Sequence, residues 1–200
     1  MTREELVRRY PLPYIVGEKD ATTPVWPIFQ QNATENKLIG YVFESIDMAP
    51  IPGFSGVPIN LLIAIDTKGN FLDVKVVSQH EPVFLDGLGT GPLFSFVSQY
   101  KGLSLKQNIR IVTGSNGARN NISADTVHLD GVSKATASVR IINQSILSSA
   151  LKVARKKLGF AEGRDPDLMA RIKPDITEPH TIKDLVAAGL IQHVVLRNAD

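Results

Sequence analysis

Short apolar segments bounded by turn residues fill the middle of the chain and predict β-strands. They are rich in valine, isoleucine, leucine and phenylalanine, side chains that fit a buried pleated sheet. Between two of them lies the sequence Asp-Thr-Lys-Gly-Asn, 66–70, which is typical of the tight turn of a β-hairpin. The predicted strands cover residues 38–43, 59–65, 71–77, 109–112 and 126–129.

A helical pattern dominates one later segment. Between residues 137 and 158, apolar side chains recur every three to five positions and polar ones fill the gaps, so one face of a long helix belongs to the core. Three basic residues at 155–157, followed by Gly159, mark its C-terminus. Pro92 opens a shorter amphipathic segment that runs to Tyr100. Two more short helices are predicted at 3–10 and 181–189.

Strands and helices cluster along the chain instead of alternating, which predicts an α+β fold: a twisted antiparallel sheet packed with a few helices. Residues 1–35 are rich in proline, threonine and asparagine and predict an irregular surface arm, which Trp26 would anchor to the core. We expect residues 36–160 to form the main domain and 161–200 a C-terminal extension. The remaining expectations are an exposed loop at 114–121 and a closing strand at 192–197.

The composition narrows the class of protein. Hydrophobic residues make up 43% and charged residues 21% of the 200, as in a soluble globular chain. Lysine and arginine number 22 against 20 acidic residues, with no long basic run, so nucleic acid is not an expected partner. The absence of cysteine excludes disulfides, iron–sulfur ligation by this chain and thiol catalysis.

Targeting signals are also lacking in the sequence. The N-terminal residues carry charges and have no apolar core, which excludes a signal peptide there, so we expect a cytosolic chain or one whose leader was removed. The longest uncharged run, 48–65, is broken by three prolines and two glycines. It predicts a loop and a buried strand, not a membrane-spanning helix.

Two sequence features suggest chemistry but are weak by themselves. A glycine cluster at 87–91 matches neither the dinucleotide nor the nucleoside-triphosphate motif; it suits a tight turn, although glycines would also let a flat ligand approach the backbone. His80-Glu81-Pro82 follows a strand and equally suits a turn that ends it. The four histidines are far apart, so no metal site is expected, and no nucleophile elbow indicates hydrolysis.

Residues 130–136, Asp-Gly-Val-Ser-Lys-Ala-Thr, are the most informative segment. They bring hydroxyl groups to the start of the long helix, where unpaired backbone N–H groups and the helix dipole favour an anion such as phosphate. The simpler alternative is that Ser133 only caps the helix.

The same segment resembles the flavinylation motif of the FMN-binding domain family, in which a terminal threonine carries FMN through a phosphoester bond. Relatives occur in sodium-pumping NADH:quinone oxidoreductases and Rnf complexes, and the quinone reductases have glycine where this chain has Lys134. The resemblance makes Thr136 the covalent attachment residue. It assigns the surrounding flavin-binding loop to Asp130, Gly131, Ser133, Lys134 and Ala135.

A second hallmark of the family is a glycine-containing loop that lies against the flavin. The residues that resemble it are His80, Glu81 and Pro82, followed by Gly87, Leu88 and Gly89. Three further segments, 40–44, 52–56 and 102–104, are similar to a branch of the family found in membrane-bound proteins of denitrification. The resemblance covers about residues 25–160 and implies that this chain is one domain of a longer protein.

The resemblance implies an electron-transfer domain with covalent FMN and no substrate turnover of its own. Because no obvious internal base would activate Thr136, a separate Mg²⁺-dependent flavin transferase would donate FMN from FAD. The resemblance implies that the domain lies in the periplasm and works with the membrane and ferredoxin-like parts of the same protein. It also implies nitrous-oxide reductase or its assembly factors as partners, because the domain would support the activity and maturation of that enzyme. The alternative is a non-redox interaction or sensor module that binds the same partners. A free enzyme acting on a phosphorylated metabolite would need an acid or base that the sequence does not offer.

Overall fold

The computed structural model describes residues 1–33, 35–112, 125–160 and 181–188. The chain divides into two compact units, Met1–Glu162 and Gly163–Asp200, which are described separately. The described part of the second unit contains helix α5 (Ile182–Ala187), which begins where the Thr181 hydroxyl accepts a hydrogen bond from the Asp184 N–H. This confirms the helix expected at 181–189. The loop predicted at 114–121 and the strand predicted at 192–197 lie outside the described residues.

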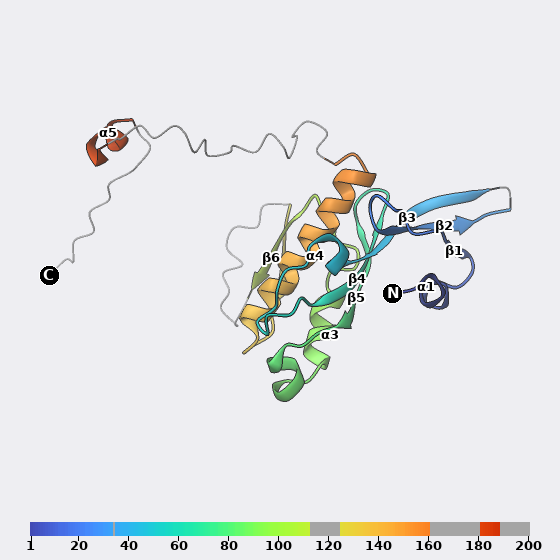
Figure 1. Ribbon diagram of the computed structural model, residues 1–200, viewed down its shortest axis with the longest axis horizontal. Helices are drawn as coiled ribbons and strands as arrows, with labels where there is room; N and C mark the ends of the chain where they lie inside the picture. The colour runs from blue at the N-terminus through green and yellow to red at the C-terminus, as the bar shows by residue number, and fades with distance from the viewer. Residues whose placement is uncertain (34, 113–124, 161–180, 189–200) are drawn as a thin grey trace. The chain divides into compact units, whose positions relative to one another are not determined.

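A five-stranded antiparallel sheet forms the centre of the first unit (Figure 1). Its turn between the fourth and fifth strands closes where the Asp66 N–H donates to the Asn70 carbonyl over 2.8 Å, and Gly69 supplies the left-handed residue, with φ of 83°. The predicted strands and hairpin are thereby confirmed. In sheet order the strands are β1 (Tyr14–Val16), β2 (Val25–Gln31), β3 (Asn36–Glu44), β4 (Asn60–Asp66) and β5 (Phe71–Ser78).

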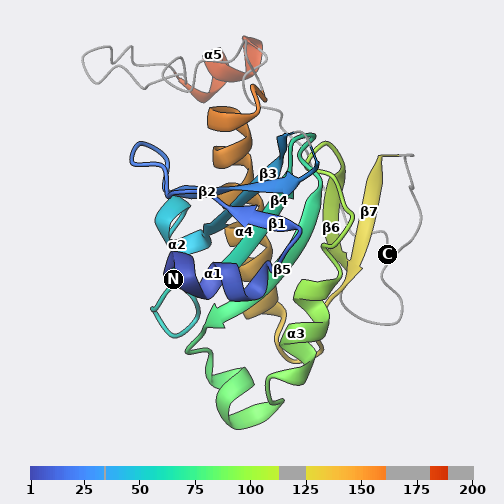
Figure 2. The ribbon, with the colours of Figure 1, turned by 90° about the vertical axis from the view of Figure 1, so that its right-hand side faces the viewer.

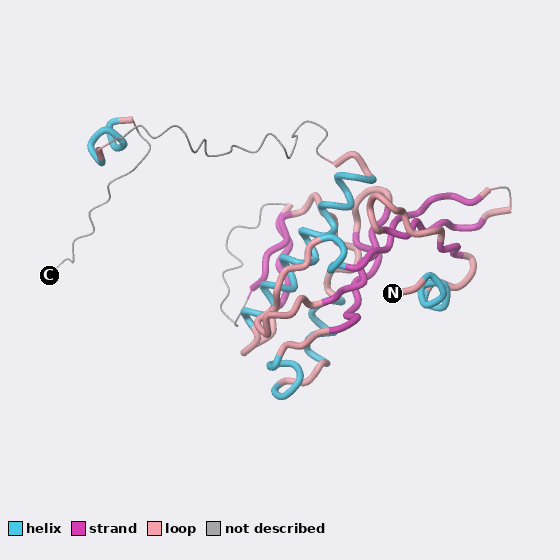
Figure 3. Tube along the Cα trace, in the orientation of Figure 1, coloured by secondary structure: helices cyan, strands magenta, loops and turns pink. Residues whose placement is uncertain are grey.

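Figure 3 distinguishes the helices of this unit from its strands. In sequence, α2 lies between β3 and β4, and the remaining elements, apart from the N-terminal helix, follow β5. A second sheet consists of two parallel strands, which the sequence pattern placed correctly but did not predict to pair in parallel. No described helix is long and apolar enough to span a lipid bilayer. The elements are α2 (Ser45–Met48), the π-helix η1 (Val83–Gly87), α3 (Gly91–Ser98), β6 (Asn108–Val112), β7 (Thr126–Asp130) and the long helix α4 (Thr136–Lys157). The α+β class and the long helix are confirmed.

Both faces of the five-stranded sheet are covered, which explains why β4 is apolar at almost every position. Leu61, Ile63 and Ile65 point into a core shared with α3 and α4, whereas Leu62 and Ala64 point into a second core on the opposite face. Helix α1 (Arg3–Arg9) contributes to that second core, and Figure 2 shows α1 and α4 on opposite sides of the sheet.

Helix α1 confirms the helix predicted at 3–10, whereas the prediction of an irregular arm is wrong for the rest of residues 1–35. This part contains β1 and β2, and β2 pairs with β3 from Val25↔Phe43 to Gln31↔Asn36. The turn-forming composition was misleading because pairing to β3 and burial of apolar side chains decide the conformation here. Trp26 is 2% exposed and anchors the segment as predicted. The division at residues 35 and 160 stays a prediction.

The N-terminal segment is also tied to the far end of α4 by an ion pair. Asp20 accepts a hydrogen bond of 2.6 Å from the Lys157 ammonium, and the backbone N–H groups of Thr22 and Thr23 donate to the same carboxylate. The Lys157 ammonium, together with these donors, holds the pKa of Asp20 well below its usual range.

Candidate functional site

The loop between β7 and α4 is held at its beginning by backbone hydrogen bonds. The side-chain amide of Gln99, on the turn after α3, accepts from the Asp130 N–H at 2.8 Å and donates to the Asp130 carbonyl at 3.0 Å. The Gly131 N–H donates to the Val112 carbonyl at 2.8 Å. Two segments distant in sequence, the turn after α3 and the end of β6, therefore fix where the loop starts, and its remaining residues lead to Thr136.

Thr136 is the first residue of α4 and is partly exposed. Ala135, which is buried, occupies the N-cap position, and no side chain caps the helix. The alternative that Ser133 caps the helix is therefore wrong: it lies two residues before the N-cap and is exposed. The helix start leaves its N–H groups without a side-chain acceptor, which suits the approach of an anion.

Lys134 has a left-handed backbone, with φ of 66°, and is the one non-glycine residue of the described chain with positive φ. A left-handed conformation brings Cβ close to the backbone, so glycine adopts it more readily than lysine. This explains why glycine suits the corresponding position of the family motif. Lys134 adopts the same left-handed conformation and adds a positive charge next to the start of α4.

We expect Lys134→Gly to raise the free energy of unfolding by about 0.5–1 kcal/mol. The left-handed conformation costs a non-glycine residue roughly 1–2 kcal/mol, whereas the extra backbone entropy of glycine costs about 0.5–1 kcal/mol. Urea unfolding would measure the change. Lys156→Gly, in the last turn of α4, is the matched control and should lower stability by a similar amount. A loss of stability in both variants would contradict the assigned backbone conformation.

Glu81 contacts the beginning of α4. Its side chain is fully buried, and one carboxylate oxygen accepts a hydrogen bond from the Ser138 hydroxyl. The other oxygen accepts from Ser55, whose backbone N–H lies 3.3 Å away and whose hydroxyl lies 3.4 Å away. The buried carboxylate of Glu81 thus links the second motif, residues 80–82 and 87–89, to the first turn of α4.

The other residues of the second motif lie on the surface. His80, Pro82 and the loop 87–89 are exposed, and within the described residues no hydrogen bond links their side chains to the loop before α4. The turn after Glu81 forms η1, with Pro82 at its N-cap, where the sequence predicted a loop. Pro92 lies in the first turn of α3, as predicted. The contact of these exposed residues with flavin stays a prediction.

Two residues at the site were missed in the sequence. Gln99 holds Asp130 from 31 positions away, and no local pattern indicates this. Ser138 had a detectable signal, because it lies four residues before Ile142 and seven before Ser145, along the buried stripe of α4. Most buried hydroxyl groups are hydrogen-bonded, so a serine on this helix face points to a polar partner, although the hydroxyl of Ser145 on the same stripe has none among the described residues.

A surface pocket of about 500 Å³ lies between α3 and the loop before α4. This volume falls within the roughly 300–1,000 Å³ typical of cofactor sites. Four residues of the 130–136 segment line it, so its size and position fit an FMN group held by this loop. The lining comprises Pro92, Ser95, Phe96, Gln99, Asp130, Gly131, Val132 and Ser133.

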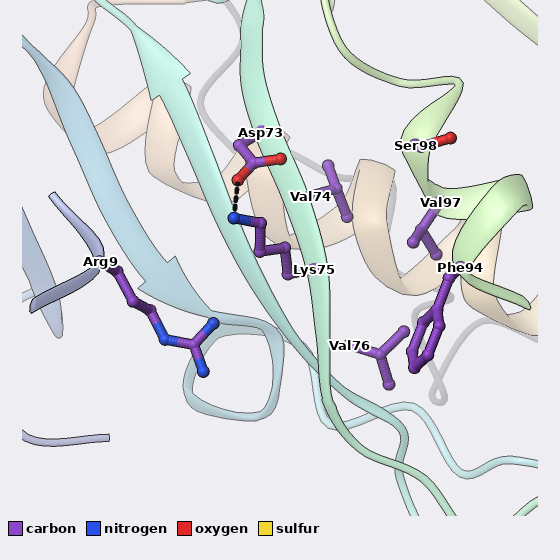
Figure 4. Close-up of a pocket in the computed structure, with 8 residues that line it drawn as sticks. All are labelled: Arg9, Asp73, Val74, Lys75, Val76, Phe94, Val97 and Ser98. Atoms are coloured by element: carbon purple, nitrogen blue, oxygen red, sulfur yellow. Dashed lines mark ion pairs between the residues drawn. The ribbon is translucent and has the colours of Figure 1, made fainter. Parts of the chain in front are cut away.

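A second pocket, of about 360 Å³, lies beside β5 and α3 and contains none of the predicted site residues (Figure 4). Its wall is apolar at Val76, Phe94 and Val97, and Arg9 reaches toward it from the end of α1. Asp73 and Lys75, which form an ion pair of 3.0 Å, also line it. Among the described residues no three histidine, aspartate or glutamate side chains cluster as metal ligands would.

Residues 53–150 match the model of the FMN-binding domain family, and this part of the chain belongs to that family. The matched segment contains β4, β5, the Glu81 turn and the complete loop before α4. The resemblance noted from these motifs is therefore confirmed, and FMN is the cofactor after which the family is named.

Three proteins of known name are similar to this chain, and two of them are named as regulatory proteins. The chain is 33% identical over 166 residues to "Regulatory protein NosR" of Stutzerimonas stutzeri, a match that covers 80% of this chain and 21% of that protein. It is 33% identical over 126 residues to "Regulatory protein NosR" of Pseudomonas aeruginosa, covering 63% and 16%. It is 25% identical over 188 residues to "Protein NirI" of Paracoccus denitrificans, covering 94% and 24%. The chain thus spans less than a quarter of each of these relatives.

Proposed function

We propose that this chain is the covalent-FMN electron-transfer domain of a NosR-type protein, with FMN attached to Thr136 through a phosphoester bond. The observation that carries the proposal is the position of this threonine. It begins a helix of 22 residues, it is partly exposed, and a pocket of suitable size lies beside the loop that leads to it. The FMN-binding family match over 53–150 supports the same cofactor.

The attachment requires a second protein. No described side chain hydrogen-bonds to the Thr136 hydroxyl, and an alcohol is a weak nucleophile until a base or metal activates it. A Mg²⁺-dependent flavin transferase would therefore use FAD as the donor. The threonine oxygen forms a bond to the phosphorus on the flavin side, the pyrophosphate bond breaks, and AMP leaves with the hydroxyl proton, so no redox change occurs. Asp130, exposed at the end of β7, is our candidate contact for the transferase.

The chain itself would position and stabilise the attached group. The N–H groups of the first turn of α4 and the nearby Lys134 ammonium favour the negative phosphodiester, an interaction worth about 0.3–1 kcal/mol at an exposed helix end. Bound FMN would supply one- and two-electron redox chemistry, whereas the protein supplies attachment and orientation. The domain would accordingly have no substrate turnover of its own.

We place this domain in the periplasm, beside the membrane and ferredoxin-like parts of its own protein. Its electrons would support nitrous-oxide reductase, or the assembly factors of that enzyme, during denitrification. Similarity to the NosR proteins supports a NosR-like role, whereas the location and the partners are proposed from the resemblance of the motifs alone. The second candidate is a regulatory module that binds the same partners without flavin, which the word "regulatory" in the names of those relatives favours.

Intact mass of the purified chain separates the two candidates. After co-expression with a flavin transferase, we expect the mass to rise by one phosphoester-linked FMN and the yellow colour to survive denaturation. Chain expressed without the transferase is the control and should keep its unmodified mass. A colourless, unmodified chain in both samples would refute the carrier and support the flavin-free module.

A further inference from the structure

A carboxylate without a cationic partner is buried at the centre of the candidate site. Glu81 is 0% exposed, and no lysine, arginine or histidine of the described residues forms an ion pair with it. Its charge is instead balanced by hydrogen-bond donors on two other segments, Ser55 and Ser138. Burying a charged group costs free energy, and the hydrogen bonds from Ser55 and Ser138 offset part of that cost.

The turn around Gly53 is shaped to receive this carboxylate. A Cβ atom on Gly53 would lie 2.2 Å from Oε1 of Glu81 and 2.9 Å from the Val57 carbonyl oxygen, so no larger residue fits without displacement. The Gly53 N–H donates to the Val57 carbonyl at 3.0 Å and closes the turn around the site. The carboxylate therefore fills a specific place between the 53–57 turn and α4.

We propose that Glu81 is a positioning residue that acts on Thr136 through Ser138. Ser138 lies two residues after Thr136 in the same first turn of α4, so anchoring its hydroxyl fixes the rotation of the helix start. Gln99 fixes the other end of the attachment loop by its two hydrogen bonds to Asp130. Thr136 lies between these two anchors and is held where a transferase can reach it.

This role differs from direct contact with the flavin. Both carboxylate oxygens of Glu81 are engaged inside the protein, so Glu81 would have to give up Ser55 or Ser138 to reach a bound group. Its shape and hydrogen-bonding capacity therefore matter more than its charge. The consequence for flavin attachment rests on the proposed function, whereas the anchoring of α4 can be measured on the apo chain.

The test compares five proteins: wild type, Glu81→Ala, Glu81→Gln, Ser138→Ala and the double variant Glu81→Ala/Ser138→Ala. Apo chains are incubated with a flavin transferase, FAD and Mg²⁺, and the initial rate of covalent incorporation is followed by mass. Amide hydrogen exchange of the same apo chains is measured in the 53–57 turn, the first turn of α4 and the second half of α4. Ser149→Ala is the matched control, because Ser149 is also buried on α4 but donates to the Ser45 carbonyl.

We expect Glu81→Ala and Ser138→Ala each to slow incorporation by about tenfold or more, since misplacing a reacting group by about 1 Å can cost two orders of magnitude. Exchange should rise in the 53–57 turn and the first turn of α4 but not in its second half. Glu81→Gln should recover most of the rate, because the Ser138 hydroxyl can accept a hydrogen bond from the amide. The double variant should be no slower than the slower single variant, and Ser149→Ala should leave the rate near that of wild type.

Two results would overturn the proposal. Wild-type rates and exchange in Ser138→Ala, which removes one hydroxyl and is the mildest variant, would show that Glu81 does not act through the helix. A Glu81→Gln protein as slow as Glu81→Ala, with wild-type exchange, would show that the charge itself is required. If no protein in the set, wild type included, incorporates flavin, the proposed function fails, and the exchange data alone decide whether Glu81 anchors α4.

Discussion

Thr136→Val is expected to abolish covalent attachment of FMN while leaving the fold almost unchanged. Valine keeps the β-branched shape of threonine but lacks the oxygen that forms the phosphoester bond. Thr136 is partly exposed at the first position of α4, and no hydrogen bond from its side chain is recorded, so the free energy of unfolding should change by less than about 0.5 kcal/mol. Variant and wild type would be co-expressed with the transferase, denatured, digested and examined for flavin fluorescence peptide by peptide.

Ser133→Ala is the matched control for this experiment. Ser133 is the next hydroxyl upstream and is exposed, and because it does not cap α4, we expect its replacement to affect neither stability nor attachment. Flavin that persists on the peptide 130–140 of the Thr136→Val protein would show that Thr136 is not the acceptor. The exposed Ser133 would then be the better candidate, since Ser138 is 4% exposed and donates to Glu81.

Gly40→Ala is expected to cause the largest loss of stability, about 3 kcal/mol, because it overpacks the centre of the sheet. A Cβ atom at this position would lie 2.0 Å from the Ile65 carbonyl oxygen and 3.0 Å from the Asp66 Cα atom. These are backbone atoms of β4 and cannot rotate away, so β3 and β4 must separate. For a chain of this size the melting temperature should fall by roughly 6–12 °C in a thermal unfolding experiment.

The close approach at Gly40 occurs beside a β-bulge. Ile28 pairs with Gly40 and Phe29 with Leu38, so β3 has one extra residue at this point, and glycine is common beside such bulges. Gly91→Ala is the control, because an added Cβ there would meet no atom within 4 Å, and alanine favours the helical position. Equal melting temperatures for Gly40→Ala and Gly91→Ala would contradict the strand packing described above.

Those parts of the fold that depend on neighbouring residues followed from the sequence alone. The 66–70 turn, the strands on either side of it and the boundaries of α4 are set by turn chemistry and by the period of the apolar side chains, which act over a few residues. The motif at 130–136 is likewise continuous in sequence. Its residues were sufficient to indicate the FMN-binding family and to single out Thr136.

Features that depend on distant contacts were decided only by the tertiary structure. Residues 14–16 and 25–31 become strands because β2 pairs with β3 and because apolar side chains such as Trp26 cover the second face of the sheet. The hydrogen-bonded residues Glu81 and Ser138 are 57 positions apart, and no local sequence pattern indicates a contact over that separation. The left-handed backbone at Lys134, the parallel pairing of β6 and β7 and the burial of Glu81 arise in the same way. Each is favourable only when segments far apart in the chain are already packed together, and the side-chain periodicity that predicts a strand or a helix contains no information about its partner.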